Sequence, residues 1–255
     1  MTEAVAPGAS FGVVFVGPRN AGKTSLYRHY NQRDFDPDQK ASQGVDQCIR
    51  RGEVVNGRKR DVTLRDICGQ DTYAQNMTAW HLRNMHCVVF MGDATRWEPA
   101  PAAGGSAPKT TVDDVFGLQK WVRVVKDQQP DVARVVVFNK ADMLPGIRIG
   151  RDGRVEDFES SVPANFMPAE EIEAYLKAID LTTKDGKPVP YYFTSARTGD
   201  GTGPVIQRAF ELATEVVSDP AMAPPTETEK PPAKIESKQW APKKRKEEGG
   251  CCSRS

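Results

Sequence analysis

The sequence has no long hydrophobic run and almost no net charge. No apolar stretch approaches the roughly 18 residues that a membrane-spanning helix needs. The first residues carry neither the basic nor the apolar segment of a secretory signal, and Thr2 stands where N-myristoylation requires glycine. The formal net charge is +1 over 255 residues. A global basic field of the kind that binds nucleic acid is therefore excluded, and no nucleic-acid partner is expected.

Cysteine is also scarce, with five residues in the whole chain. Cys48, Cys68 and Cys87 lie far apart, and no pair has the spacing of zinc ligands. We interpret them as reduced, unreactive core thiols. Cys251 and Cys252 are adjacent and nearly terminal, which is a different signal.

What the chain does contain is a phosphate-binding motif. Residues 17–25 fit the pattern G-x-x-x-x-G-K-[ST]. The apolar, β-branched residues 10–16 predict a buried strand before the motif, and helical spacing predicts a helix after it, to about Gln32. In that context successive N–H groups converge on an anion at a helix N-terminus, whereas a chance match would be an ordinary strand-to-helix turn. The candidate phosphate-binding residues are Gly17, Pro18, Arg19, Asn20, Ala21, Gly22, Lys23, Thr24 and Ser25.

Strands and helices alternate along the rest of the chain. The predicted strands are 45–55 and 59–66, joined by a hairpin turn at Asn56-Gly57, and then 87–91, 133–138 and 190–194. The predicted helices are 73–85, one from Val115 through Val125, one that Pro168 opens as its first residue, and 204–217. This order predicts an α/β fold, a three-layer P-loop NTPase sandwich with a mostly parallel six-stranded sheet and helices on both faces.

Composition divides the chain into three parts. Residues 1–9 are small and polar and are expected to form a flexible arm, and residues 10–218 form the domain. Two insertions, near 96–110 and 146–167, interrupt the domain, and Asp152-Gly153 favours a small hairpin in the second. Residues 219–255 are Pro-rich at first and lack hydrophobic periodicity, so a disordered tail is expected there.

Within the phosphate loop, Lys23 can reach terminal phosphates, and the Thr24 hydroxyl can hold a bridging Mg²⁺. Three further motifs carry chemistry at predicted strand ends. Asp66-Ile-Cys-Gly-Gln70 offers a carboxylate for Mg²⁺ or its water, the Gly69 N–H for a γ-phosphate, and Gln70 as the candidate catalytic residue that positions water. Taken alone, this second motif is more typical of an ordinary turn.

Asn139-Lys140-Ala141-Asp142 points to the base. A carboxylate at Asp142 can accept two hydrogen bonds from the N1–H and N2–H₂ edge of guanine, a donor pair that adenine lacks. Thr194-Ser195-Ala196 can present a backbone N–H to guanine O6. Each motif by itself could also be a strand-end turn.

Together, in this order, the motifs resemble the small Ras-like GTPases over residues 10–217. Gly44-Val45-Asp46, Asp93-Ala94-Thr95 and the terminal Cys251-Cys252 resemble the Rab branch. The resemblance implies a Ras-like G domain that binds GTP and GDP with Mg²⁺, hydrolyses GTP slowly, and binds effectors in the GTP form. An exchange factor and a GTPase-activating protein are implied as partners. It also implies that Ser42 joins Thr24 and Asp66 as a metal ligand and that the guanine-binding set is Asn139, Lys140, Asp142, Ser195, Ala196 and Arg197.

Several residues depart from the Rab pattern. Gln47 and Arg65 stand where Rabs place aromatic residues, Cys68 replaces a usual alanine, and Arg19 occupies a normally small position in the phosphate loop. Two other interpretations therefore stay open. One is a scaffold that holds GTP and hydrolyses it negligibly, and the other is a different P-loop enzyme such as a small-molecule kinase.

The last residues predict a membrane anchor. Cys251 and Cys252 resemble the double cysteine that Rabs have geranylgeranylated, and the basic residues 243–246 precede them. Two lipid chains, or one chain with a basic cluster, hold a protein firmly on an anionic leaflet. The resemblance thus implies a regulator of vesicle traffic on the cytoplasmic face of an endomembrane that cycles with the cytosol. A pair of unmodified exposed cysteines is the alternative.

Overall fold

A computed structural model describes residues 10–70, 80–97, 114–144, 146–150, 152–158 and 167–218. These residues belong to the first of two units into which the chain divides, Met1–Ala223, and the second unit, Pro224–Ser255, lies outside the described residues. Within the described ranges, no helix is both long enough and apolar enough to cross a membrane.

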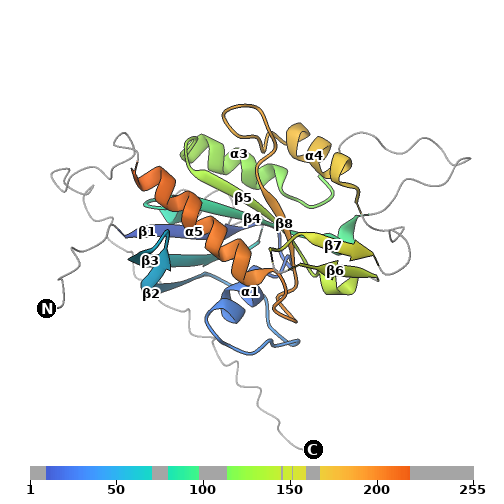
Figure 1. Cartoon of the computed structure of the whole chain (residues 1–255), viewed down its shortest axis with the longest axis horizontal. Helices are drawn as coiled ribbons and strands as arrows, with labels where there is room; N and C mark the ends of the chain where they lie inside the picture. Colours follow the sequence, from blue (N-terminus) through green and yellow to red (C-terminus); the bar gives the residue numbers. More distant parts are fainter. Residues whose placement is uncertain are drawn as a thin grey trace, which may run out of the picture. The chain divides into compact units, whose positions relative to one another are not determined.

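A six-stranded sheet in the order β2-β3-β1-β4-β5-β8 carries the fold (Figure 1). Only the β2–β3 pair is antiparallel, and every other neighbouring pair is parallel. The predicted α/β fold with a mostly parallel six-stranded sheet is confirmed. The strands are β1 (Phe11–Val16), β2 (Val45–Val55), β3 (Arg58–Ile67), β4 (Cys87–Asp93), β5 (Ala133–Asn139) and β8 (Tyr191–Thr194).

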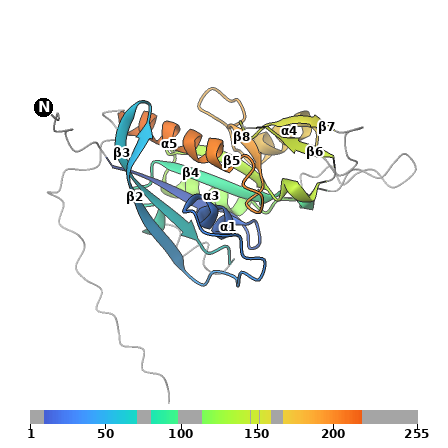
Figure 2. The ribbon, with the colours of Figure 1, turned by 60° about the horizontal axis from the view of Figure 1, so that its bottom comes forward.

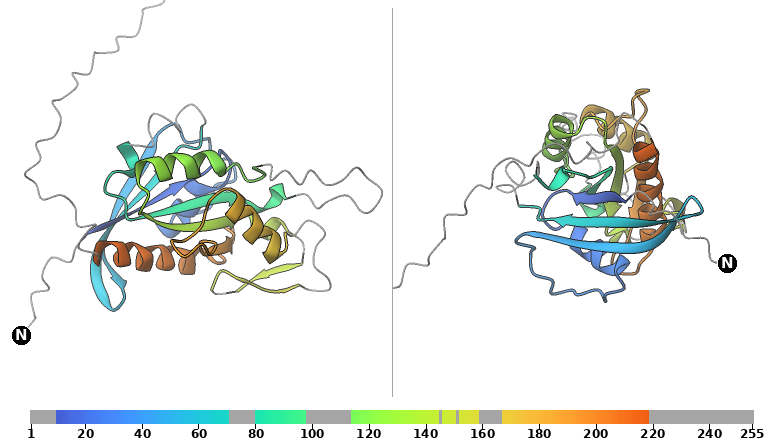
Figure 3. Two further views of the ribbon diagram at one scale, coloured as in Figure 1. Left: turned by 90° about the horizontal axis from the view of Figure 1, so that it is seen from above. Right: turned by 90° about the vertical axis from the view of Figure 1, so that its left-hand side faces the viewer.

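Helices cover both faces of the sheet, because every residue of β1 and β4 is buried and needs apolar cover on either side. One face packs against α3 (Gln119–Gln128) and α4 (Ala169–Ala178) through side chains such as Trp121 and Ile172. The other face packs against α1 (Lys23–Tyr30) and α5 (Thr202–Ser218) through Leu26 and Phe210. Figure 3 shows α3 and α5 on opposite sides of the sheet.

The helix expected from Val115 begins later, at Gln119. Gly117 adopts a left-handed backbone with φ of +67°, which cannot continue a helix. The Asp114 carboxylate accepts hydrogen bonds from the N–H groups of Leu118 and Gln119 at 2.7 and 2.9 Å. The Asp114 side chain thus caps the N-terminus of α3, and the extra helical turn that the apolar spacing predicted does not form.

Two proline-based expectations also shift. Pro168 has an extended ψ of 152° and precedes Ala169, the first residue of α4, so it is not the first helical residue. The last helix begins at Thr202, two residues before Pro204. A proline is tolerated there because the first N–H groups of a helix have no partner within the helix.

The second insertion contains the predicted small hairpin. Strands β6 (Ile147–Ile149) and β7 (Val155–Phe158) pair in antiparallel fashion, and Gly153 in their turn has φ of +76°. The Phe193 N–H donates to the Gly153 carbonyl at 2.8 Å, which attaches the turn to β8. Figure 2 shows β6 and β7 beside α4 and β8.

Other expectations lie outside the described residues. These are the arm at 1–9, most of the helix at 73–85, most of the first insertion, and the tail at 219–255 with its two cysteines.

Candidate functional site

A cavity of about 690 Å³ lies where the strands of the parallel sheet end. The phosphate loop after β1 supplies Lys23 and Thr24, and the loop after β5 supplies Asp142. Ala196 follows β8, and Ser42 comes from the segment before β2. Carboxyl ends of parallel strands are the usual location of ligand sites in open α/β sheets. The fold therefore brings residues from four loops to one cavity.

Glycine at two loop positions is required by close packing. Gly17 has φ of +144°, and a Cβ there would lie 2.2 Å from the Met91 carbonyl oxygen. Gly22 has φ of +86°, and a Cβ there would lie 2.0 Å from Asn139 Nδ2. Positive φ values at such positions are what an anion-binding loop needs for its successive N–H groups to converge at a helix N-terminus.

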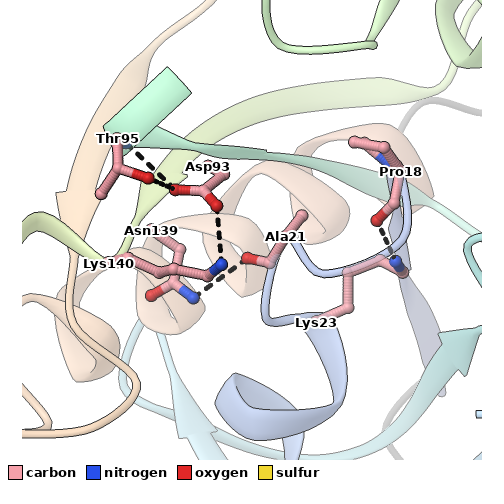
Figure 4. A network of polar contacts seen from close by, with 7 residues as sticks. All are labelled: Pro18, Ala21, Lys23, Asp93, Thr95, Asn139 and Lys140. Atoms are coloured by element: carbon pink, nitrogen blue, oxygen red, sulfur yellow. Dashed lines mark hydrogen bonds and ion pairs between the residues drawn. The ribbon is translucent and has the colours of Figure 1, made fainter. Parts of the chain in front are cut away.

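The Lys23 ammonium lies inside the phosphate loop. Its Nζ donates to the Gly17 carbonyl at 3.0 Å. It also donates to the Pro18 carbonyl at 2.8 Å (Figure 4). Burial lowers the pKa of Lys23 to about 8, although the Asp66 carboxylate opposes this effect. Desolvation lowers the pKa because it disfavours the charged form of lysine. A bound anion would raise the pKa again because it favours that form. The loop thus has the electrostatic properties of a phosphate site.

The three candidate metal ligands contact one another. The Thr24 hydroxyl donates to Asp66 Oδ2 at 2.5 Å, and its oxygen lies 2.7 Å from Ser42 Oγ. The Cys68 thiol donates to the Ser42 carbonyl at 2.7 Å, which helps to hold Ser42 in place. Two hydroxyls and one carboxylate are all oxygen donors, as Mg²⁺ prefers.

Asp66 carries the clearest sign that a cation fits. The residue is 1% exposed, and its Oδ1 is buried without a hydrogen-bond partner among the described residues. Burial raises the pKa of Asp66 to about 6, against the hydrogen bond from Thr24 and the charge of Lys23. A divalent cation or its bound water would satisfy Oδ1. The described residues contain no cluster of three or more His, Cys, Asp or Glu that could hold a metal by itself, so these ligands suit an ion shared with substrate phosphates.

Gly69 and Gln70 border the phosphate end of the cavity. A Cβ at Gly69 would lie 2.6 Å from both Arg19 N and Lys23 Nζ, so no larger residue fits against the phosphate loop. Gln70 lines the same cavity beside it. The structure therefore brings the predicted γ-phosphate donor and the predicted water-positioning amide together at the phosphate loop.

Asn139 connects three segments instead of facing the cavity with a free amide. It is 2% exposed, and its Nδ2 donates to the Ala21 carbonyl at 3.0 Å. Its Oδ1 accepts from the Thr194 hydroxyl at 3.1 Å and from the Ala196 N–H at 3.0 Å. Its described contacts thus tie the phosphate loop to the loop after β8.

Lys140 is oriented by a neighbouring strand end. Its Nζ donates to Asp93 Oδ2 at 2.6 Å, and Asp93 Oδ1 accepts from the N–H and hydroxyl of Thr95 (Figure 4). The Asp93-Ala94-Thr95 segment noted in the sequence therefore fixes the direction of the Lys140 side chain along the cavity wall.

Asp142 is the exposed carboxylate of the base end. Its Oδ1 accepts from the Ser195 hydroxyl at 2.7 Å. Two of the expected backbone donors are used within the protein, because the Ser195 N–H donates to Asp200 and the Ala196 N–H donates to Asn139. Among the described residues, the N–H of the exposed Arg197 has no partner, and Arg197 also lines the cavity.

Comparisons with known proteins agree with this geometry. The family profile described as "Ras of Complex, Roc, domain of DAPkinase" matches residues 12–142, just over half of the chain. The chain belongs to this family of Ras-like GTPase domains.

Curated relatives of this Ras-like domain are Rab proteins. It is 28% identical to Ras-related protein Rab-33A of Mus musculus over 142 residues, which cover 54% of this chain and 53% of the relative. It is 27% identical to Rab-30 of Homo sapiens over 152 residues, with 59% and 66% covered. Rab-32C of Dictyostelium discoideum is 30% identical over 135 residues, with 53% and 54% covered.

These comparisons confirm a divergent Rab-like small GTPase domain. The aligned parts span between 53% and 66% of the length of these relatives.

The structure gives a physical account of one departure from the Rab pattern. Gln47 and Arg65 are cross-strand neighbours in the β2–β3 pair, and Arg65 Nε donates to Gln47 Oε1 at 2.6 Å. Arg65 Nη1 also donates to the His81 carbonyl at 2.7 Å. The Rab-like domain thus has a hydrogen-bonded polar pair where its relatives are expected to have aromatic side chains, beside the exposed Trp80.

Apart from Ser42, sequence reasoning did not single out the residues between α1 and β2 that border the cavity. Phe35 lines it and is 40% exposed, which leaves an aromatic ring face available at the cavity wall. Arg28 of α1 donates to Gln39 and lies 3.7 Å from the Asp36 carboxylate, so it anchors this segment. A lone aromatic residue in an otherwise polar stretch was the signal that could have identified Phe35.

Proposed function

We propose that this Rab-like domain is a GTP/GDP-controlled switch that binds guanine nucleotides with Mg²⁺, hydrolyses GTP slowly and regulates vesicle traffic. The observation that carries the proposal is that Lys23 and Asp142 line one cavity. A cation for phosphates and a carboxylate for a base edge at two parts of one cavity are what a guanosine phosphate requires.

Base selection follows from the chemistry of Asp142. Its carboxylate keeps accepting capacity beyond the single bond from Ser195, because an ionised carboxylate can accept several hydrogen bonds. Guanine presents two donors on the edge that would meet it, and adenine does not. The Lys140 stem and Phe35 supply cavity wall for the flat faces of the base.

Thr24, Ser42 and Asp66 would hold Mg²⁺ together with phosphate oxygens. When bound, the ion would neutralise part of the negative charge that the phosphates carry. Lys23 would bind the phosphates directly, and Gln70 would orient the attacking water. The exposed Arg19 also lines this end of the cavity, where its guanidinium can obstruct that water. We therefore expect slow hydrolysis that depends on an activating protein.

The traffic role rests on the Rab relatives and on the terminal cysteines. An exchange factor, an activating protein and effectors are proposed as partners, on the cytoplasmic face of an endomembrane. Geranylgeranylation of Cys251 and Cys252 would provide the anchor, assisted by the basic residues 243–246. Replacing both cysteines with serine should release the protein to the cytosol and leave GTP binding unchanged. Recovery of that variant in the membrane fraction at wild-type levels would contradict the anchor.

One assay series separates the proposal from its alternatives. Purified protein should bind GTP and GDP much more tightly than ATP, and single-turnover hydrolysis should be slow but measurable. Guanine selectivity without any detectable hydrolysis would favour a GTP-holding scaffold, which the position of Arg19 also favours. Tight ATP binding with phosphoryl transfer to a small molecule would indicate a kinase and overturn the proposal.

A further inference from the structure

A second cavity lies away from the nucleotide site, at the end of the sheet that β8 forms. It has a volume of about 950 Å³. Its walls come from one side of α4, the loop at 186–190, β8 itself and the β7 side of the insertion hairpin. We call this cavity the β8 groove. One of its walls is formed by residues of the insertion at 146–167. None of its lining residues belongs to the phosphate or guanine motifs.

The β8 groove contains a sheet edge that is only partly used. The sheet order ends at β8, so β5 is the only strand that pairs with it in the described sheet. The Val136 N–H donates to the Pro190 carbonyl, while the Phe193 N–H donates away from β5 to Gly153. Because successive residues of a strand direct their backbone groups to opposite sides, the N–H and C=O of Tyr191 also point away from β5. Neither group has a backbone partner among the described residues.

The walls beside this edge are largely apolar. The half-buried Tyr191 and Tyr192 form its apolar surface, and the buried Ile172 and Val189 lie behind them. Side chains on either side of an added strand would therefore meet apolar surface, as side-chain pockets next to a sheet edge do in strand-addition complexes.

The charged side chains of the β8 groove are mostly basic. Arg154, Lys177 and Lys187 line it, against the single carboxylate of Glu173. Asp152 and Asp185 lie 3.7 and 3.5 Å from Arg154 and Lys187, in ion pairs that are mainly solvent-exposed. Exposed pairs of this kind are weak and are readily exchanged for another carboxylate. Among the described residues, Lys177 has no ion-pair partner.

We propose that the β8 groove binds an extended acidic peptide segment of a partner protein. The segment adds to β8 through the backbone groups of Tyr191 and places apolar side chains against the half-buried rings of Tyr191 and Tyr192. Its carboxylates pair with Lys177 and Lys187. The proposal goes beyond the nucleotide switch and does not depend on it, because no residue of the groove lines the nucleotide cavity.

The probe is a displayed library of random dodecapeptides, selected against the full chain. Selection should enrich peptides that combine alternating apolar residues with Asp or Glu. Synthetic copies, measured by fluorescence anisotropy, should bind Ala169→Trp undetectably, since Ala169 lines the groove and a large ring there fills it. The matched control is Ala178→Trp, at the exposed last residue of the same helix and outside the groove, which should bind as the wild type does.

A second pair of variants tests the charges and does not alter the packing. Combined Lys177→Glu and Lys187→Glu should weaken binding roughly tenfold or more, because two favourable pairs become repulsive. Lys184→Glu, three residues before Lys187 and outside the groove, should change the affinity little. Bound peptide should also slow hydrogen exchange at the Tyr191 amide, and methylating the central amide of the peptide should abolish binding.

Specific outcomes would overturn the proposal. These are enrichment of peptides without carboxylates, binding that survives Ala169→Trp, or unchanged exchange at Tyr191. Self-association of the wild type that Ala169→Trp abolishes would assign the groove to a second copy of the chain. Each readout uses a peptide or the chain alone, so loss of nucleotide binding would not affect it.

Discussion

Nucleotide binding is expected to be coupled to protonation of Lys23. Burial lowers the pKa of this side chain from 10.5 to about 8 in the nucleotide-free protein. Phosphates bound in the loop would surround the ammonium with negative charge and restore a pKa near the ordinary value. Binding at a pH near 8 must then draw protons from the buffer. The experiment therefore varies the pH and compares proton uptake on binding in the wild type with that in Lys23→Arg.

The magnitude follows from the two pKa values. With a free-state pKa of about 8, half of the protein carries the proton at pH 8, so binding should take up about 0.5 proton. Uptake should fall to about 0.1 at pH 7 and rise toward about 0.9 at pH 9. Lowering the Lys23 pKa from 10.5 to about 8 corresponds to a penalty on the charged form on the order of 3 kcal/mol. The same shift affects the free energy of unfolding. Because the folded-state pKa of Lys23 is lower than its unfolded value, its contribution to folding stability is fully present above pH 10.5 and is lost as the pH falls through about 8.

Calorimetric titration with Mg²⁺-GDP in buffers of different ionisation enthalpy measures the proton number directly. GDP avoids hydrolysis during the experiment, and its phosphates are already ionised at pH 8. Lys23→Arg retains the positive charge but cannot lose it, since arginine stays protonated, so its uptake at pH 8 should vanish. Lys120→Arg, which replaces another partly desolvated lysine, should leave the uptake unchanged. No uptake by the wild type at pH 8, or uptake that persists in Lys23→Arg, would refute the reasoning.

Three further substitutions have defined expected results. Asp142→Asn should weaken GTP binding by on the order of 2–4 kcal/mol and favour xanthosine triphosphate, whose 2-oxo group accepts a hydrogen bond. Nucleotide competition measures this change in preference. Equal affinity of the wild type for ATP and GTP would contradict the assignment of Asp142. Arg19→Gly should speed single-turnover hydrolysis, whereas a slower rate would mean that Arg19 assists the reaction as a finger in cis. Asp114→Ala removes the acceptor for the N-terminus of α3 and for the Tyr175 hydroxyl, so urea unfolding should show a loss of about 2–3 kcal/mol. The exposed Asp127→Ala in the same helix should cost far less, and an equal loss would remove the capping explanation.

Local patterns predicted the chemistry at the strand ends because those patterns are themselves local. The phosphate loop needs glycine at fixed positions and lysine at the helix start, and all of these lie within nine consecutive residues. Helix boundaries were less accurate. The apolar spacing from Val115 onward is compatible with a helix, but Asp114 and Gly117 divert the backbone and delay the helix to Gln119.

By itself, the sequence determined the parallel sheet, the order of the motifs and the residue types at the candidate site, because hydrophobic period and motif spacing are properties of short segments. Only the tertiary structure decided which polar groups are used within the protein. Asn139 meets Ala21 and Ala196 across long stretches of chain, and Asp66 is left with one unsatisfied oxygen at the bottom of the site. The β8 groove likewise exists only because an insertion hairpin folds back beside the sheet edge. Such contacts depend on how distant segments pack, and no local pattern records that packing.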